Sequence, residues 1–287
     1  MDTFVSLIQH RCQPNALLWY EGPELRVRAS KEIRKGDELT FCYSPVPYDY
    51  TNRQLSLVQQ WGIDCACDLC ESKGPVSLPE GSLRNRAMTL STLIANVNLA
   101  EVETAIQDIL QAGYGYGTVP LWDLYFQTIR VNLQRGKTSD CLKAALKMYY
   151  LVEPAQIPQT VLSDRISTLY VIVSLMNVPQ RNSTKLEEFP DQVKYIIPHV
   201  FFHLRARLVA ATEKCFGADS AVAKFEKKTL RDMLETLEEV AQKQGHKFEY
   251  EPLKNNNRET RAFVEKMNEL LEWSGIPART EAQLHAE

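Results

Sequence analysis

Three closely spaced cysteines constrain this chain more than any other feature of its sequence. Cys65, Cys67 and Cys70 form a Cys-x-Cys-x2-Cys cluster. Zn²⁺ prefers four tetrahedral ligands, and three thiolates from one loop leave the fourth to come from elsewhere in the chain. Cys12 is the leading candidate for that position, and Cys42 competes unless its side chain points into a core. A site closed by four thiolates has no open position, so the pattern predicts a structural zinc ion.

The composition is that of an ordinary globular protein and argues against several functional classes. The chain has 33 Lys+Arg against 36 Asp+Glu and a formal charge of -3, which argues against a dedicated nucleic-acid binder. No apolar run approaches the roughly 18 residues of a membrane span. The N-terminus lacks the features of a secretory signal. We therefore expect an intracellular protein of the cytoplasm or nucleus, where clustered cysteines favour metal binding over disulfides.

Residues 1–72 carry short alternating apolar runs separated by turn signals. The runs 16–20 and 25–29 flank a turn that contains Gly-Pro, and this pattern predicts two strands. Residues 38–43 predict a further strand. A segment rich in glycine and proline, 73–81, is the expected linker.

From residue 82 to residue 287 the apolar spacing is that of helices. The predicted helices cover approximately 82–97, 101–112, 120–136, 138–150, 198–215, 221–243 and 258–273. The pair at 120–136 and 138–150 is joined by a short connection and resembles a tetratricopeptide-type unit. The sequence thus predicts an α+β, predominantly α fold with a small β-rich unit and a helical domain at 82–287.

Three ordered motifs bring a family resemblance. They are Gln-His-Arg-Cys-Gln-Pro-Asn at 9–15, Ile-Arg-Lys-Gly-Asp-Glu-Leu-Thr-Phe-Cys-Tyr at 33–43 and Cys-Ala-Cys-Asp-Leu-Cys at 65–70. Together they resemble the signatures of SET-domain protein lysine methyltransferases of the SET/MYND branch, including its post-SET cysteine loop. The resemblance covers about the first quarter of the chain. The helical remainder resembles the C-terminal helical domain of the same branch.

The resemblance implies a role for two groups of residues. It implies that Cys12, Cys65, Cys67 and Cys70 bind one zinc ion, which would pin the post-SET loop over the substrate channel. It also implies that Tyr43 is the catalytic tyrosine. A tyrosine hydroxyl can orient the neutral lysine amine in line with the sulfonium of the methyl donor.

Other family positions are occupied by different residues in this chain. Gln9 and His10 lie where the family contacts S-adenosylmethionine, but Gln9 replaces an asparagine and displaces its amide by one methylene. Arg11 replaces a serine. Trp61 stands at a position that lines the lysine channel and lacks the usual tyrosine hydroxyl, while Ile63 replaces a phenylalanine and cannot stack on the adenine of the donor. These departures predict weakened donor binding.

Two parts of the family's first half have no counterpart in this sequence. They are the strand and Gly-x-Gly loop that cradle the methyl donor, and the MYND zinc module. The glycine-rich run 113–117 falls between two predicted helices and is expected to be a helix-to-helix loop. We therefore expect a partial SET core whose open sheet edges are covered by the helical domain, by a second copy in a homodimer or by a complementing subunit.

Three functions follow from these expectations. The first is a degenerate, methyltransferase-like protein that uses S-adenosylmethionine and acts on a protein substrate, with enzymatic activity left open. The second is a non-catalytic, zinc-stapled module that presents a surface to a protein partner. The third is a repurposed pocket that binds or transforms a small molecule, with Tyr43 as a general acid and Trp61 and Trp19 as apolar walls. Neither nucleic acid nor a membrane is an expected partner.

Overall fold

The structure is a computed structural model of the 287-residue chain, and it describes residues 5–43, 49–74, 77–156, 163–246, 250–253 and 258–286. The chain divides into two compact units. The first contains residues 1–136 and 148–165, and the second contains residues 137–147 and 166–287. The predicted linker at 73–81 lies inside the first unit, and the predicted domain division stays a prediction. The fold class is α+β and predominantly α, as predicted.

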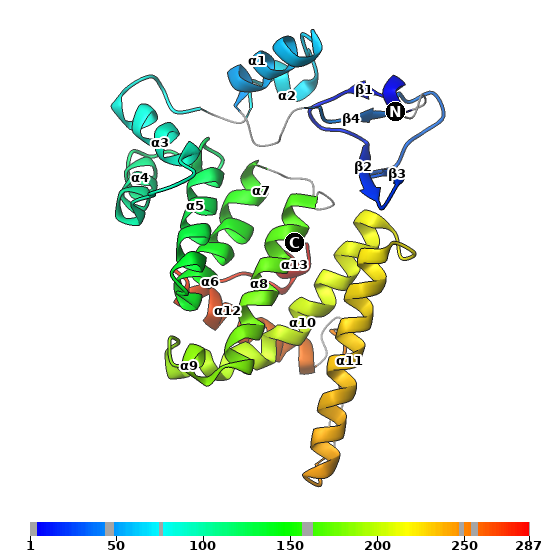
Figure 1. Cartoon of the computed structure of the whole chain (residues 1–287), viewed down its shortest axis with the longest axis vertical. Helices are drawn as coiled ribbons and strands as arrows, with labels where there is room; N and C mark the ends of the chain where they lie inside the picture. Colours follow the sequence, from blue (N-terminus) through cyan, green and yellow to red (C-terminus); the bar gives the residue numbers. More distant parts are fainter. Residues whose placement is uncertain are drawn as a thin grey trace. The chain divides into compact units, whose positions relative to one another are not determined.

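All strands of the described chain lie in its first 41 residues (Figure 1). A hairpin joins β2 (Ala16–Glu21) to β3 (Glu24–Ala29) in antiparallel register, as the sequence predicts. β1 (Gln9–His10) pairs in parallel with β4 (Thr40–Phe41). The predicted strand at 38–43 is thus only two residues long, because its partner strand ends at residue 10, where the chain turns toward Cys12.

The first unit also contains several helices and helical turns. They are α1 (Tyr50–Trp61), α2 (Asp68–Glu71), α3 (Ser82–Thr92), α4 (Leu99–Gln111), α5 (Leu121–Gln134), the π-helical turn η2 (Met148–Val152) and α7 (Glu153–Gln156). The helices α3, α4 and α5 contact one another and bury apolar faces such as those of Val102, Ile109 and Leu124. The glycine-rich run 113–117 connects α4 to α5, as predicted.

Helix α3 ends at Thr92 and not near residue 97, so the predicted end was wrong. Side chains of α5 bind the carbonyl groups beyond the last turn of α3. Gln127 donates to the carbonyls of Ser91 and Leu93, and Arg130 donates to those of Leu93 and Ile94. A contact from another element therefore stabilises the helix end, and the local sequence pattern does not encode it.

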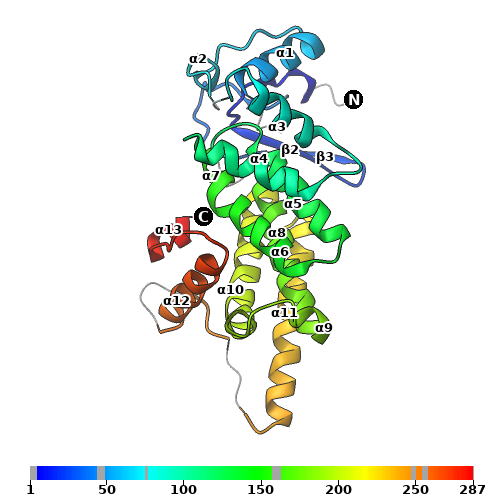
Figure 2. The same cartoon turned by 90° about the vertical axis from the view of Figure 1, so that its left-hand side faces the viewer.

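The second unit is entirely helical in its described part (Figure 2). Its elements are α6 (Thr138–Lys147), most of α8 (Ser163–Arg181), α9 (Ser183–Leu186), α10 (Asp191–Phe216), α11 (Ala221–Lys243), α12 (Arg258–Trp273) and α13 (Glu281–Ala286). Helix α10 packs against both α11 and α12. The predicted helix at 198–215 begins seven residues earlier, because Pro190 and Asp191 form its N-terminus and Pro198 is accommodated inside it.

No helix in the described part of the chain is long and apolar enough to cross a lipid bilayer.

Candidate functional site

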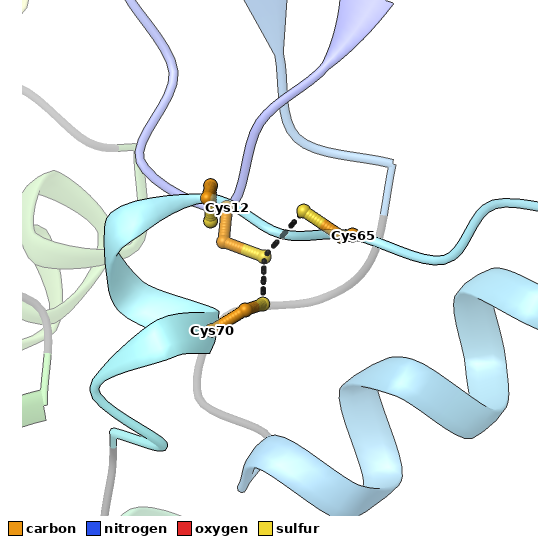
Figure 3. Close-up of side chains that lie close together, drawn as sticks. Cys12, Cys65 and Cys70 are labelled. Atoms are coloured by element: carbon orange, nitrogen blue, oxygen red, sulfur yellow. Dashed lines mark hydrogen bonds between the residues drawn. The ribbon is translucent and has the colours of Figure 1, made fainter.

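Four cysteines from two distant parts of the sequence lie close together. The sulfur atoms of Cys12, Cys65, Cys67 and Cys70 all lie within 4.8 Å of one another. The sulfur of Cys12 is 3.5 Å from that of Cys70 and 4.0 Å from that of Cys65 (Figure 3). Four thiolates that hold Zn²⁺ tetrahedrally at about 2.3 Å would keep their sulfurs about 3.8 Å apart. The cluster therefore has the dimensions of a zinc site, and Cys42 is not part of it.

The backbone around α2 shapes the loop that carries three of these cysteines. Cys67 is the N-cap of α2, and its carbonyl accepts the N–H groups of Cys70 at 2.7 Å and of Glu71 at 2.9 Å. This tight turn brings Cys67 and Cys70 to one side of the loop. Arg11, next to Cys12, and Asp68 of the same loop form an exposed ion pair at 3.0 Å, which contributes little to holding the two segments together.

The thiols of the cluster differ in acidity. Burial is the largest cause that raises the pKa of Cys12, and the neighbouring Cys70 adds to it. Burial also raises the pKa of Cys65 to about 11. Cys67 is also affected by burial, but hydrogen bonds from the backbone of Cys12 and Cys70 prevail and lower its pKa to about 7. The cluster therefore contains one readily formed thiolate, Cys67, whereas Cys12 and Cys65 would ionise readily only beside a cation.

Helix α1 packs against the cysteine cluster, and this helix was not predicted from the sequence. The Gln54 side chain donates to the carbonyl of Cys65 and accepts its N–H at 3.2 Å. Leu57 is fully buried against the cysteines. The Asp49 carboxylate caps the helix by accepting the N–H of Asn52 at 2.8 Å. An acidic N-cap before an amphipathic run was the signal that could have revealed α1.

His10 connects the cysteine cluster to Tyr43. Its Nδ1 accepts the backbone N–H of Tyr43 at 3.0 Å, so the ring proton belongs on Nε2, which lies 3.3 Å from the sulfur of Cys12. Burial, followed by the charge of Arg53, lowers the pKa of His10 and favours this neutral ring. Hydrogen bonds from outer residues to metal ligands fix the orientation of those ligands. His10 thus couples the predicted catalytic position to the candidate metal centre.

Tyr43 lies in a group of aromatic side chains beside the cluster. Its ring centroid is 4.8 Å from those of Phe41 and Trp61 and 5.4 Å from that of His10. The hydroxyl of Tyr43 donates to the carbonyl of Ile8. Trp61, at the last position of α1, is 55% exposed, and its ring contacts that of Tyr43 at the protein surface. The structure therefore brings together the predicted catalytic tyrosine and the predicted channel residue.

The two other predicted donor contacts, Gln9 and Ile63, have partners within the chain. The exposed side chain of Gln9 donates to the carbonyl of Leu7 at 3.4 Å. Ile63 is half-buried and packs against the cysteine cluster. Their roles in donor binding stay predictions.

Asn15 and Thr40, which were not predicted as site residues, form a buried hydrogen-bonded pair that joins the motif at 9–15 to the motif at 33–43. The Oδ1 atom of Asn15 accepts the backbone N–H of Thr40 at 2.8 Å, and its amide donates to the carbonyl of Glu38 at 2.8 Å. Asn15 and Thr40 are 8% and 3% exposed. These hydrogen bonds hold the segment that carries Cys12 against the strand that leads to Tyr43.

A match to a known family falls on the same part of the chain. Residues 1–44 match the SET domain family. This SET segment contains Gln9, His10, Cys12 and Tyr43, so the resemblance to SET-domain lysine methyltransferases that the motifs predict is confirmed.

Curated relatives with this similarity are lysine methyltransferases. Histone-lysine N-methyltransferase SMYD3 of Mus musculus is 36% identical over 69 residues, which are 24% of this chain and 16% of that protein. Protein-lysine N-methyltransferase SMYD4 of Homo sapiens is 37% identical over 71 residues, 24% of this chain and 9% of that protein. Histone-lysine N-methyltransferase ASHR1 of Arabidopsis thaliana is 36% identical over 80 residues, 28% and 17%. The matched segment thus spans less than a fifth of each relative.

Proposed function

We propose that this chain is a zinc-stapled, SET-type protein that transfers a methyl group from S-adenosylmethionine to lysine side chains of a protein substrate. One observation carries the proposal. Tyr43 lies between His10 and Trp61, and His10 in turn contacts Cys12 of the four-cysteine cluster. The similarity of the SET segment to lysine methyltransferases supports the same chemistry.

The cysteine cluster would hold one structural zinc ion. The cluster fits the ion because its four sulfurs lie within 4.8 Å of one another and because His10 directs a donor at the sulfur of Cys12. Four thiolates leave no position for a substrate, so the ion would stabilise the loop and take no part in methyl transfer. The zinc ion would thereby hold α1, and Trp61 at its end, beside Tyr43.

S-adenosylmethionine, when bound, supplies a methyl group activated by a sulfonium. The Tyr43 hydroxyl would orient a neutral lysine amine for in-line attack on that methyl carbon. Trp61 would line the path of the lysine side chain and reduce the access of water. The exposed amide of Gln9 and the ring of His10 would contact the donor, and Ile63 remains a predicted contact of the adenine.

A transfer assay with matched tyrosine variants tests this function. Zinc-loaded protein is incubated with S-adenosylmethionine labelled in its methyl group and with a lysine-peptide library. Y43F should lower the transfer rate at least 100-fold, while Y20F, which alters an exposed tyrosine of β2, should leave it unchanged. Equal rates for Y43F and the unaltered chain would contradict the role of Tyr43, and no transfer by any form would contradict the proposed activity.

A second candidate function is a non-catalytic module that binds a protein partner. Its support is the packing of Ile63 against the cysteines and the hydrogen bond that occupies the Gln9 amide, because both side chains are then engaged within the chain. This function predicts that Y43F changes partner binding little and that S-adenosylmethionine does not bind. A repurposed small-molecule pocket stays a prediction, to be tested by ligand-induced changes in tryptophan fluorescence.

A further inference from the structure

Arg53 is a buried cation at the base of the cysteine cluster. Its side chain belongs to α1, is only 2% exposed and is among the largest fully buried side chains of the described chain. Its Nη2 atom lies 3.9 Å from the sulfur of Cys70 and is directed at it as a donor. Arginine is rarely this buried unless an opposite charge or a set of acceptors accompanies it.

The charge of the candidate metal centre supplies a reason for this burial. One Zn²⁺ ion with four thiolates has a net charge of -2, and three of the four cysteines are buried. A buried double negative charge is costly unless cations or hydrogen-bond donors compensate it. A guanidinium keeps its positive charge inside a protein, so Arg53 offers both a charge and donors.

The other donors near the cluster do not supply that charge from a buried position. The geometry of His10 makes it a neutral donor toward Cys12. Arg11 is charged, but its side chain is 44% exposed and is paired with Asp68. Within the described residues around the cysteines, Arg53 is therefore the cation that shares their buried environment.

Helix α1 holds this cation in a fixed position. The backbone N–H of Arg53 donates to the carbonyl of the N-cap residue Asp49 at 2.9 Å. The next residue, Gln54, forms two hydrogen bonds with the backbone of Cys65, and Leu57, one turn later, packs against the cysteines. The guanidinium is thus placed by a helix that is itself attached to the cysteine loop.

We propose that Arg53 is the buried counter-cation of the zinc–thiolate centre, raising its affinity for zinc by offsetting the negative charge of the four thiolates. Arg53 is a positioning and charge-balancing residue and not a ligand. This inference rests on the proposed zinc site, and it predicts an energetic link between α1 and metal binding that an arginine retained only for packing would not produce.

Zinc affinity measured by chelator competition tests the inference. R53M keeps much of the side-chain volume and removes the charge, and we expect it to weaken zinc binding 10-fold to 100-fold. R53K keeps the charge and should lose less than R53M. R11M removes a cation next to Cys12 but at an exposed position, and its affinity should stay within about 3-fold of the unaltered chain.

Thermal unfolding of zinc-loaded and metal-free samples separates charge balance from packing. R53M should reduce the gain in melting temperature that zinc provides. If R53M lowers both melting temperatures equally and keeps the zinc affinity of the unaltered chain, the inference is overturned. If R53M does not fold, R53K decides, because retention of most of the affinity supports charge balance and a loss of 10-fold or more contradicts it. Failure of the unaltered chain to bind zinc would instead overturn the metal site itself.

Discussion

At the scale of single residues, the candidate metal centre is formed by cysteines that are far apart in the sequence. Cys12 lies 53 residues before Cys65, yet their sulfurs are 4.0 Å apart. The spacing of the three clustered cysteines indicated a metal site, but it left Cys12 and Cys42 as alternatives for the fourth position. The alternation of side chains along a strand could not decide between them, because the strand that precedes Cys42 is only two residues long.

Replacing one cysteine of the cluster should abolish metal binding and lower stability. We expect C65S to lose the zinc ion and to be destabilised by several kcal/mol, because a structural zinc contributes directly to folding. C42S is the matched control and should retain one zinc per chain. Elemental analysis together with chemical unfolding measures both effects. A metal-free C65S protein as stable as the unaltered zinc-loaded chain would contradict a structural role for the ion.

Asp123 should give the first unit a measurable dependence on pH. Burial raises the pKa of this carboxyl group, in the first turn of α5, to about 6. The native state therefore binds the proton more tightly than the unfolded chain, and the stability that the neutral form provides is lost as the pH rises from about 4 through 6. D123N should add about 3 kcal/mol to the free energy of unfolding at pH 8 and less than about 1 kcal/mol at pH 4.

Urea unfolding at the two pH values measures this effect. D232N, which replaces an exposed aspartate of α11, serves as the control. Its effect on the free energy of unfolding should be the same at pH 4 and at pH 8. A D123N protein that is stabilised equally at both pH values would show that the carboxyl group titrates normally in the native state.

At the scale of elements, periodicity revealed helices α11 and α12, which are amphipathic, and missed α8, whose exposed face is partly apolar. Helices α11 and α12 match their predicted bounds, because apolar residues recur along one side of each. Helix α8 was not predicted. Its buried residues Leu169, Ile172, Val173 and Met176 share one face. The opposite face also carries apolar side chains, the exposed Tyr170 and Val178, so the sequence shows little contrast between an apolar and a polar face.

The helix that supports the candidate site was missed for a different reason. The contacts that give α1 its importance are tertiary, since Arg53 and Gln54 are polar residues whose partners lie in the cysteine loop. No local pattern distinguishes them from solvated residues. The sequence therefore predicted the cysteines, Tyr43 and Trp61 as site residues, but not the helix that holds them together.

Removing the Gln54 amide should weaken the metal centre without removing a ligand. Q54A deletes the two hydrogen bonds that fix the backbone of Cys65, and we expect a loss of about 1–2 kcal/mol in stability together with weaker zinc binding. Q59A makes the same change on the exposed side of α1 and should cost less than about 0.5 kcal/mol. Equal effects of the two substitutions would show that the hydrogen bonds between Gln54 and Cys65 contribute nothing.

At the scale of the whole molecule, the chain consists of two compact units, and the candidate site belongs to one of them. The cysteines, Tyr43 and α1 lie in the first unit. The second unit has its own core around α10 and α12, which includes Phe201 and Met267. Two cores of this kind permit two separate unfolding transitions.

A cavity in the second core should leave the metal centre intact. M267A removes a fully buried side chain and should cost about 2–5 kcal/mol in the unit that contains it. The zinc affinity should not change. Calorimetric unfolding with and without a chelator would show whether one transition responds to M267A and another to zinc removal; a single transition that responds to both would contradict independent units.

Calorimetric titration of the zinc-loaded chain with S-adenosylmethionine tests the proposed function most directly. The SET segment and the arrangement of His10, Tyr43 and Trp61 predict saturable binding with one donor per chain and a Kd of about 1 μM, or roughly -8 kcal/mol. The absence of binding by zinc-loaded, folded protein would contradict a methyltransferase function for this chain and favour the non-catalytic module.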